Sequence, residues 1–124
     1  MGAFGPAVES GDITRISAAL ADDVTFRSPA VHAPYSGRDT VTFILSAVVQ
    51  VFEDFTYVGT IRDDSQEMLR FRARVGEREI DGVDIVTYDD SGQVAELTVM
   101  IRPYSALTAV KDAMAAALAA AKPA

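Results

Sequence analysis

The sequence predicts an α+β fold: a strongly twisted antiparallel sheet that carries helices on one face. Three observations predict it. Apolar residues recur at helical spacing in the first half of the chain, the spacing changes to every second residue from Phe55 onward, and only short turns separate the resulting strands. Strands joined by such short turns pair antiparallel, and their apolar face must be covered by helices.

The first elements are expected to be two short helices and a strand. Residues 6–10 could form one or two helical turns closed by Gly11, and Asp12 is a suitable N-cap for the next helix. Residues 21–23 are expected to end this helical region, and residues 24–28 then alternate as a strand does. The apolar residues on one face of the second helix are Ile13, Ile16 and Leu20.

A loop and a longer helix follow. Residues 28–37 contain two prolines and a glycine, which is typical of a loop. The next helix carries a continuous apolar stripe over residues 41–52. Ser36 and Asp39 have the spacing of a capping box at its start.

Four strands and a final helix complete the expected fold. Pro103 cannot continue a central strand, and Ser105 is a suitable cap for a helix over residues 105–121. We expect a single domain over residues 1–124, with a short N-terminal segment at 1–11. The four strands are expected at residues 55–61, 67–75, 79–88 and 94–102.

The composition excludes several classes of function. A net charge of −7 and a pI near 4.5 disfavour binding to nucleic acid or to an anionic membrane surface. The chain has no cysteine, so it can form neither a disulfide nor a thiolate site, and with His32 as its one imidazole no metal site or other cofactor is expected. No secretory signal is visible at the N-terminus, so a cytoplasmic location is expected.

Strand 67–75 shows which face of the sheet is buried. Leu69, Phe71 and Ala73 alternate with three arginines, which cannot be buried unpaired, so the apolar set must face inward. The arginines are then either solvated, paired with Asp and Glu on adjoining strands, or part of an anion-binding stripe.

Asp84 is the most informative residue of the next strand. It shares a face with Ile80, Gly82 and Val86, where an unpaired carboxylate is costly. It must therefore be hydrogen-bonded, paired, or protonated with a raised pKa, and a protonated carboxyl can serve as a proton donor. The structural alternatives are an ion pair with an arginine such as Arg102, or a hydrogen bond with Tyr88 or Tyr57.

The last strand is apolar on both faces. Leu97, Val99 and Ile101 form one face, and the other includes Thr98 and Met100. A strand of this kind in an antiparallel sheet needs a cover on its outer side. We therefore expect a homodimer through the outer sheet face, with Met100 and Thr98 near its centre.

Several local motifs resemble the NTF2-like superfamily, specifically its SnoaL-like branch. They are residues 21–26 with Ser28 and Pro29, residues 35–38, residues 82–84, and residues 89–94 leading to 97–103. The resemblance implies a cone-shaped, curved antiparallel sheet around an apolar cavity, with helices on its concave face, as in a cystatin-like roll. Members include ketosteroid isomerase, polyketide cyclases, epoxide hydrolases and dehydratases, as well as proteins without catalysis, so the fold does not fix the function.

The family's functional residues are only partly kept. Where ketosteroid isomerase has its general base and its oxyanion-hole tyrosine, this chain has Ser28 and, near the tyrosine position, Phe4; its protonated aspartate matches Asp84. Steroid isomerisation by that three-residue mechanism is therefore not expected. In the Asp-Arg-Asp set of the epoxide hydrolases, Asp84 fits one member and Gly82 stands where the arginine belongs.

Two hypotheses remain. Either the protein is an isomerase, cyclase or hydrolase acting on a small apolar ligand, with Asp84 as acid or base and His32 or Tyr35 assisting, or it is a non-catalytic ligand-binding or dimerisation domain. His32 is a candidate because it titrates near neutrality, although a lone loop histidine can simply be a surface residue. Asp84 facing an open cavity without an arginine would favour the enzyme. The expected ligand-binding residues are Tyr35, Tyr57, Phe71, Val86, Val99 and Ile101.

Overall fold

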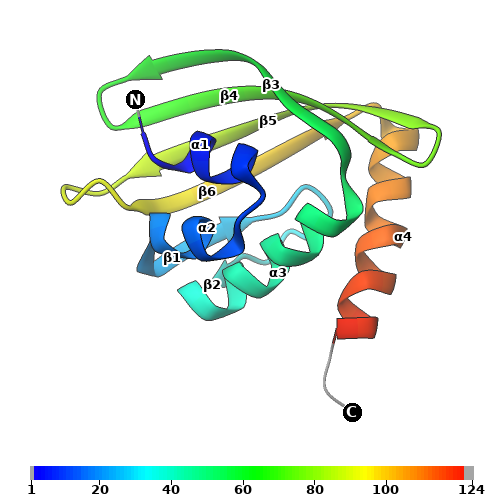
Figure 1. Ribbon diagram of the computed structural model, residues 1–124, viewed down its shortest axis with the longest axis horizontal. Coiled ribbons are helices and arrows are strands. Elements are labelled where there is room, and N and C mark those ends of the chain that lie inside the picture. The colour runs from blue at the N-terminus through cyan, green and yellow to red at the C-terminus, as the bar shows by residue number, and fades with distance from the viewer. Residues whose placement is uncertain (1, 122–124) are drawn as a thin grey trace.

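The computed structural model describes residues 2–121, and in this part of the chain four helices pack under a six-stranded sheet. Figure 1 shows the helices on the concave side of the curved sheet, with α4 descending from one end of it. The predicted α+β fold with a curved sheet is thereby confirmed. The helices are α1 (Phe4–Ser10), α2 (Ile13–Ala19), α3 (Arg38–Val51) and α4 (Tyr104–Ala121). The strands are β1 (Leu20–Arg27), β2 (Tyr35–Ser36), β3 (Glu53–Asp63), β4 (Gln66–Val75), β5 (Arg78–Tyr88) and β6 (Val94–Arg102).

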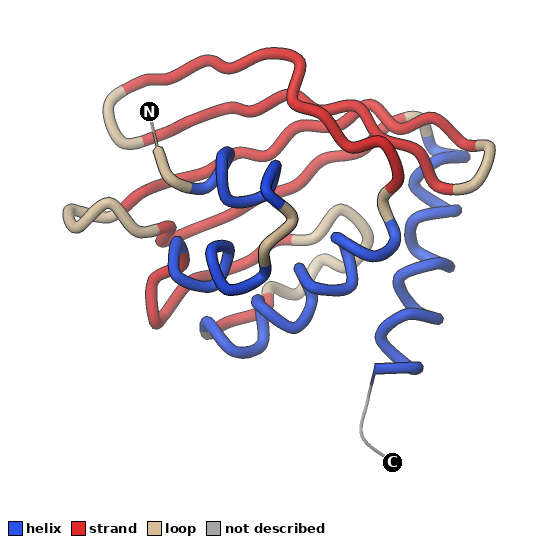
Figure 2. The backbone as a smooth tube through the Cα atoms, in the orientation of Figure 1, coloured by secondary structure: helices blue, strands red, loops and turns tan. Residues whose placement is uncertain are grey.

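The sheet is mixed, because one pair of strands is parallel. Its order is β2-β1-β6-β5-β4-β3, and β1 pairs with β6 in parallel while the other neighbours are antiparallel. After β2, helix α3 carries the chain to β3 at the far edge, and three tight turns bring it back to β6 beside β1 (Figure 2). The antiparallel pairing expected for the four long strands is confirmed, whereas the parallel place of β1 was not foreseen.

The N-terminal elements differ from the prediction at one boundary. Gly11 closes α1 in the left-handed conformation, and the Asp12 side chain caps α2 by accepting a hydrogen bond from the Thr14 amide, as expected. Residues 21–23 do not end a helix; they already belong to β1. Ala21 is buried there, and Asp22 is held by an ion pair with Arg38, so tertiary contacts override the weak strand preference of these residues.

The starts of α3 and α4 also differ. Gly37 is the N-cap of α3 and no side chain caps it, so the capping box expected from Ser36 and Asp39 is wrong. Ser36 instead pairs with Thr25 in the short strand β2. Helix α4 begins at Tyr104, which places Ser105 inside its first turn.

The core lies between the concave face of the sheet and the helices. Its fully buried side chains come from nearly every element, including Phe4 of α1, Ile16 of α2, Val41 of α3 and Phe71 of β4. On β4 the buried residues alternate with exposed ones, as the arginine argument predicted. Side chains do not fill all of the space between the concave face and the helices. The cavity that remains is the site described next.

Candidate functional site

An apolar pocket of about 320 Å³ lies between the concave face and the helices. Its walls come from α1, α3, α4, the loop at residues 28–31 and the inner face of the long strands. Apart from Tyr35, the lining residues with polar side chains in the described chain are Ser28, Asp84 and Lys111. A space of this size suits a small, mainly apolar molecule.

Asp84 is the buried carboxylate of this pocket. It sits in the middle of β5 on the inward face, it is 6% exposed, and it lines the cavity. Its Oδ2 accepts a hydrogen bond of 2.7 Å from the Tyr57 hydroxyl, and Oδ1 accepts none from the side chains of residues 2–121. Burial raises the pKa of Asp84 to about 7, against a smaller lowering by the Tyr57 hydrogen bond.

Tyr57 is fixed in place by other aromatic rings. Its ring meets that of Phe55 edge to face at a centroid distance of 4.9 Å, and Phe55 stacks on Phe71 at 5.0 Å. Burial, followed by the nearby Asp84 carboxylate, raises the pKa of Tyr57 well above its usual range. The hydroxyl is therefore a permanent donor to Asp84 at neutral pH.

Gly82 makes room for this aromatic cluster. It pairs with Phe71 across β4 and β5, and a Cβ atom at Gly82 would overlap the Phe71 ring. The missing side chain therefore lets Phe71 lie flat against the sheet. The position where an epoxide hydrolase would carry an arginine is thus filled by the ring of Phe71.

The other predicted residues are only partly brought together. Tyr35, Phe71, Val99 and Ile101 line the pocket with Asp84. Two predicted residues are not part of the lining: Val86 is fully buried in the core, and Tyr57 donates its hydroxyl to Asp84. His32 is exposed on the loop, and although its neighbour Val31 lines the pocket, the imidazole does not. The structure thus places Tyr57, rather than His32, next to Asp84.

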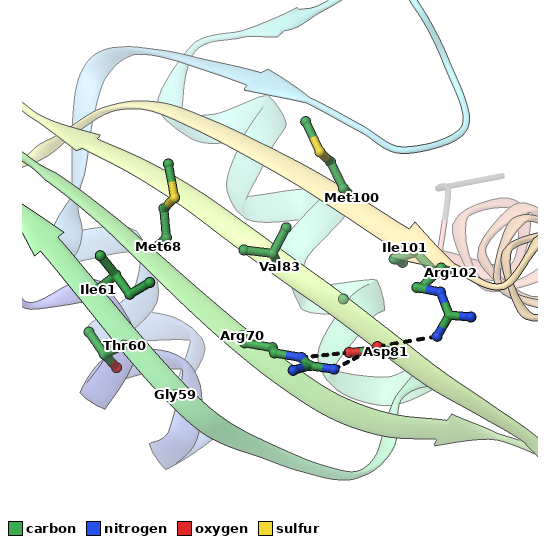
Figure 3. A pocket seen from close by; sticks show the side chains of 11 residues that line it. Gly59, Thr60, Ile61, Met68, Arg70, Asp81, Val83, Met100, Ile101 and Arg102 are labelled. Atoms are coloured by element: carbon green, nitrogen blue, oxygen red, sulfur yellow. Dashed lines mark hydrogen bonds and ion pairs between the residues drawn. The ribbon is translucent and has the colours of Figure 1, made fainter.

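The arginines pair on the opposite face of the sheet. Both oxygens of Asp81 accept hydrogen bonds of 3.0 Å from Arg70, and Arg102 lies 3.4 Å from the same carboxylate (Figure 3). Arg72 also lies 3.4 Å from it. These hydrogen bonds, the one from Arg70 foremost, lower the pKa of Asp81 to about 2. Arg102 is therefore paired with Asp81 and not with Asp84, since Asp81 and Asp84 point to opposite faces of β5. Of the open alternatives, pairing with neighbouring carboxylates explains the arginines.

A second hollow, of about 640 Å³, lies on this outer face. Met68, Val83 and Met100 project into it beside the arginine cluster (Figure 3). Met68 and Met100 are 40% and 54% exposed. The outer face of β6 thus carries an exposed methionine, Met100, at the place expected for the centre of a dimer interface.

Two further residues matter that sequence reasoning missed. Glu67 is 1% exposed and accepts a hydrogen bond of 2.6 Å from Tyr88. Glu67 lies two residues before Leu69, so strand alternation alone puts it on the buried face of β4. The sequence therefore contained this signal. Lys111 lines the pocket from α4, on the same helical face as Met114 and Leu118, and that spacing could also have identified it.

Residues 2–121 contain no group of three or more histidine or carboxylate side chains placed to hold a metal ion. Across the same residues, the helices lack either the length or the hydropathy that a bilayer-spanning segment requires.

The chain resembles known proteins over most of its length. The model of the SnoaL-like domain matches residues 3–97. A steroid delta-isomerase from Pseudomonas aeruginosa is 39% identical, with a TM-score of 0.89, and the match covers 93% of this chain and 85% of that one. A bacterial protein with a cystatin-like fold from Silicibacter pomeroyi is 36% identical, with a TM-score of 0.88 and coverage of 92% and 81%.

The fold recurs at much lower identity. A de novo designed protein with a curved β-sheet has a TM-score of 0.70 at 12% identity, covering 86% of this chain and 90% of that one. No curated protein matches the sequence.

Proposed function

The chain belongs to the SnoaL-like family, and from that premise we propose that it is an acid–base enzyme that moves a proton on a small, mainly apolar substrate. One observation carries the proposal. Asp84 lies buried in an apolar cavity, its hydrogen-bond partner is Tyr57, and no arginine of residues 2–121 forms an ion pair with it.

The pKa of Asp84 suits this role. At about 7, both the carboxylate and the carboxylic acid are populated near neutral pH, so the group can take a proton and return it. Because Oδ2 accepts the Tyr57 hydrogen bond, Oδ1 is the atom available to the substrate.

Isomerisation of an unsaturated carbonyl compound fits these residues best. Asp84 Oδ1 would take a proton from the carbon next to the carbonyl as the carbon–carbon double bond shifts, and would return it at the far end of the conjugated system. Asp84 is the one carboxyl among the described lining residues, so it would perform both transfers. The likeness to a steroid delta-isomerase at 39% identity supports this reaction class.

The test is the conversion of a β,γ-unsaturated ketone to its conjugated isomer, followed by ultraviolet absorbance. Asp84→Asn should lower kcat by at least about a hundredfold, whereas Asp81→Asn, on the outer face of the same strand, should leave it unchanged. If Asp84→Asn turns over as the wild type does, the acid–base proposal is wrong. Ligand binding that depends on Asp84 but never leads to turnover would favour the alternative, a non-catalytic binding domain.

We also propose that two copies of the chain associate through the outer sheet face. The exposed side chains of Met68, Met100 and Ile61 support this, since a surface of this kind is expected to be covered. A stable interface would bury on the order of 1,600 Å² in total. Light scattering should return a dimer mass at micromolar concentration, and Met100→Glu should return a monomer mass; a monomeric wild type would contradict the proposal.

A further inference from the structure

One face of α4 forms a wall of the pocket. Lys111, Met114, Ala115 and Leu118 follow the spacing of a single helical face, and all four line the cavity. Three of them are apolar, as a wall of this pocket requires. A lysine therefore stands on the face of α4 that is turned to the ligand space.

Lys111 has no ion-pair partner among the carboxylates of residues 2–121. It is the cationic member of the described lining, in a protein with a net charge of −7. Its aliphatic stem can lie along the apolar wall while the ammonium group reaches water. The lysine thus brings local positive charge to a cavity whose other walls are almost entirely apolar.

The two charged groups of the lining differ in depth. Asp84 is buried in the middle of the sheet, whereas Lys111 is exposed on α4. Val31, also in the lining, is 45% exposed, so the cavity reaches the surface of the protein. A ligand that fills the cavity would meet a hydrogen-bonding carboxyl at its inner end and an ammonium group toward its outer end.

We propose that the ligand is an apolar carboxylic acid. Its reacting unsaturated end would lie at Asp84, its apolar body would fill the cavity, and its carboxylate would pair with Lys111. This inference rests on the proposed function of the same pocket and adds the class of substrate.

The test uses ω-(4-hydroxyphenyl)alkanoic acids of increasing chain length, each compared with its methyl ester by titration calorimetry. The phenol supplies the group for Asp84, and the acid and the ester differ at the outer end only, in the charge and in one methyl group. The best-binding acid should bind about fivefold more tightly than its ester, the advantage of a solvent-exposed ion pair. Added salt should reduce this advantage, because exposed charges are screened.

Variants assign the effect to the lysine. Lys111→Met keeps the apolar stem and should remove the advantage of the acid, while Lys111→Arg should keep it. Arg15→Met is the matched control, because it removes the same charge from α2, whose residues do not line the cavity. It should leave the affinities of the acid and of the ester unchanged.

The outcomes separate this inference from the proposed function. If acid and ester bind equally, or Lys111→Met has no effect on the acid, the ligand class is wrong even where Asp84→Asn abolishes turnover. If the acid depends on Lys111 while Asp84→Asn changes neither binding nor turnover, the ligand class stands and the acid–base function fails. If neither acid nor ester binds the wild type, the ligand class is overturned, and the ketone assay alone decides the acid–base function.

Discussion

Two carboxylates of the described chain are buried on the concave face of the sheet, and each accepts a hydrogen bond from a tyrosine. Asp84 pairs with Tyr57 at 2.7 Å, and Glu67 pairs with Tyr88 at 2.6 Å. They belong to adjacent strands, since Asp84 faces Leu69 across the β4–β5 ladder, two residues from Glu67. Similar chemistry therefore occurs twice within a short distance.

The surroundings of the two pairs differ. Glu67 also accepts a hydrogen bond of 3.3 Å from the Gly2 amide and lies 3.5 Å from the Arg62 guanidinium. Tyr88 in turn accepts one of 3.2 Å from the Phe4 amide, and a Cβ atom at Gly2 would overlap the Tyr88 ring. The N-terminal segment thus closes over Glu67.

Asp84 has one side-chain donor within residues 2–121 and faces a cavity. Burial alone therefore does not indicate a reactive carboxylate. Asp84 differs from Glu67 in having fewer hydrogen-bond donors around its carboxylate and a cavity beside it. We interpret Glu67 as a structural anion that ties α1 to the sheet, and Asp84 as the group available to a ligand.

The largest effect is expected from Glu67→Ala. It leaves the Tyr88 hydroxyl, the Gly2 amide and the Arg62 guanidinium without their partner, and should lower the free energy of unfolding by about 3 kcal/mol. Urea unfolding measures this change. Glu67→Gln, which keeps an acceptor, should cost less than half as much, and a loss below about 1 kcal/mol for the alanine variant would contradict the structural role.

Asp84→Asn should instead raise the free energy of unfolding at neutral pH. The pKa of Asp84 is about 7 in the folded protein and 3.8 ordinarily, so ionising the buried group opposes folding increasingly from about pH 4 to about pH 7. Each unit of this difference is worth about 1.4 kcal/mol, and part of the gain is offset because the amide nitrogen of asparagine brings a hydrogen-bond donor into an apolar site. We expect a net stabilisation of about 2 kcal/mol at pH 8 and none at pH 4.

The pH dependence is the decisive readout for Asp84. Thermal unfolding of the wild type and of Asp84→Asn, measured in parallel from pH 4 to pH 8, should give curves that diverge as the pH rises. An asparagine variant that is less stable by several kcal/mol at pH 7 would make Asp84 a structural anion like Glu67.

Removing either tyrosine hydroxyl should have a smaller effect than replacing its carboxylate partner. Tyr88→Phe should cost about 1.5 kcal/mol of stability, because two buried groups lose a partner. Tyr57→Phe should instead raise the pKa of Asp84 further, by about one unit, since its hydrogen bond favours the charged form. Carbon-13 NMR of the Asp84 carboxyl measures this pKa, and an unchanged value would mean that Tyr57 does not tune it.

The smallest effect is expected at the helix that borders the pocket. Helix α1 is tied to the sheet through Glu67 and Tyr88, whereas α4 packs through a narrow apolar stripe that ends in Leu118. Leu118→Asp should lower the free energy of unfolding by about 1 kcal/mol or less, and should weaken ligand binding as well. A loss as large as that for Phe4→Ala would mean that α4 is integral to the core.

Alternation along the strands predicted most of this arrangement. It placed Asp84 on the buried face and the arginines on the outer one, and Tyr57 was one of the partners considered. A period of two identifies the face of each residue, but it does not identify the neighbour across the sheet, because strand register depends on long-range packing. Alternation already puts Arg102 on the outer face with Thr98 and Met100, whereas the choice between Tyr57 and Tyr88 as the partner of Asp84 was settled by the structure.

The errors have a common physical origin. Residues 21–23 have weak strand preference, and they are extended because they lie between Leu20 and Thr25, which both pair with a strand from the far end of the sequence. The roles of Glu67 and Lys111 likewise depend on what packs against them: the N-terminal segment on one and the cavity on the other. Local patterns carry no information about such contacts, whereas the fold class follows from the patterns alone.

The parallel pairing of β1 with β6 also bears on how the chain folds. The strands from β3 to β6 are joined by tight turns, so their ladders can form after the closure of small loops. The β1–β6 ladder instead requires closure of most of the chain, which is slow in proteins rich in non-local contacts. During synthesis, the edge of β1 that faces β6 stays unpaired until β6 has left the ribosome, and the pocket can be completed only after α4 has followed.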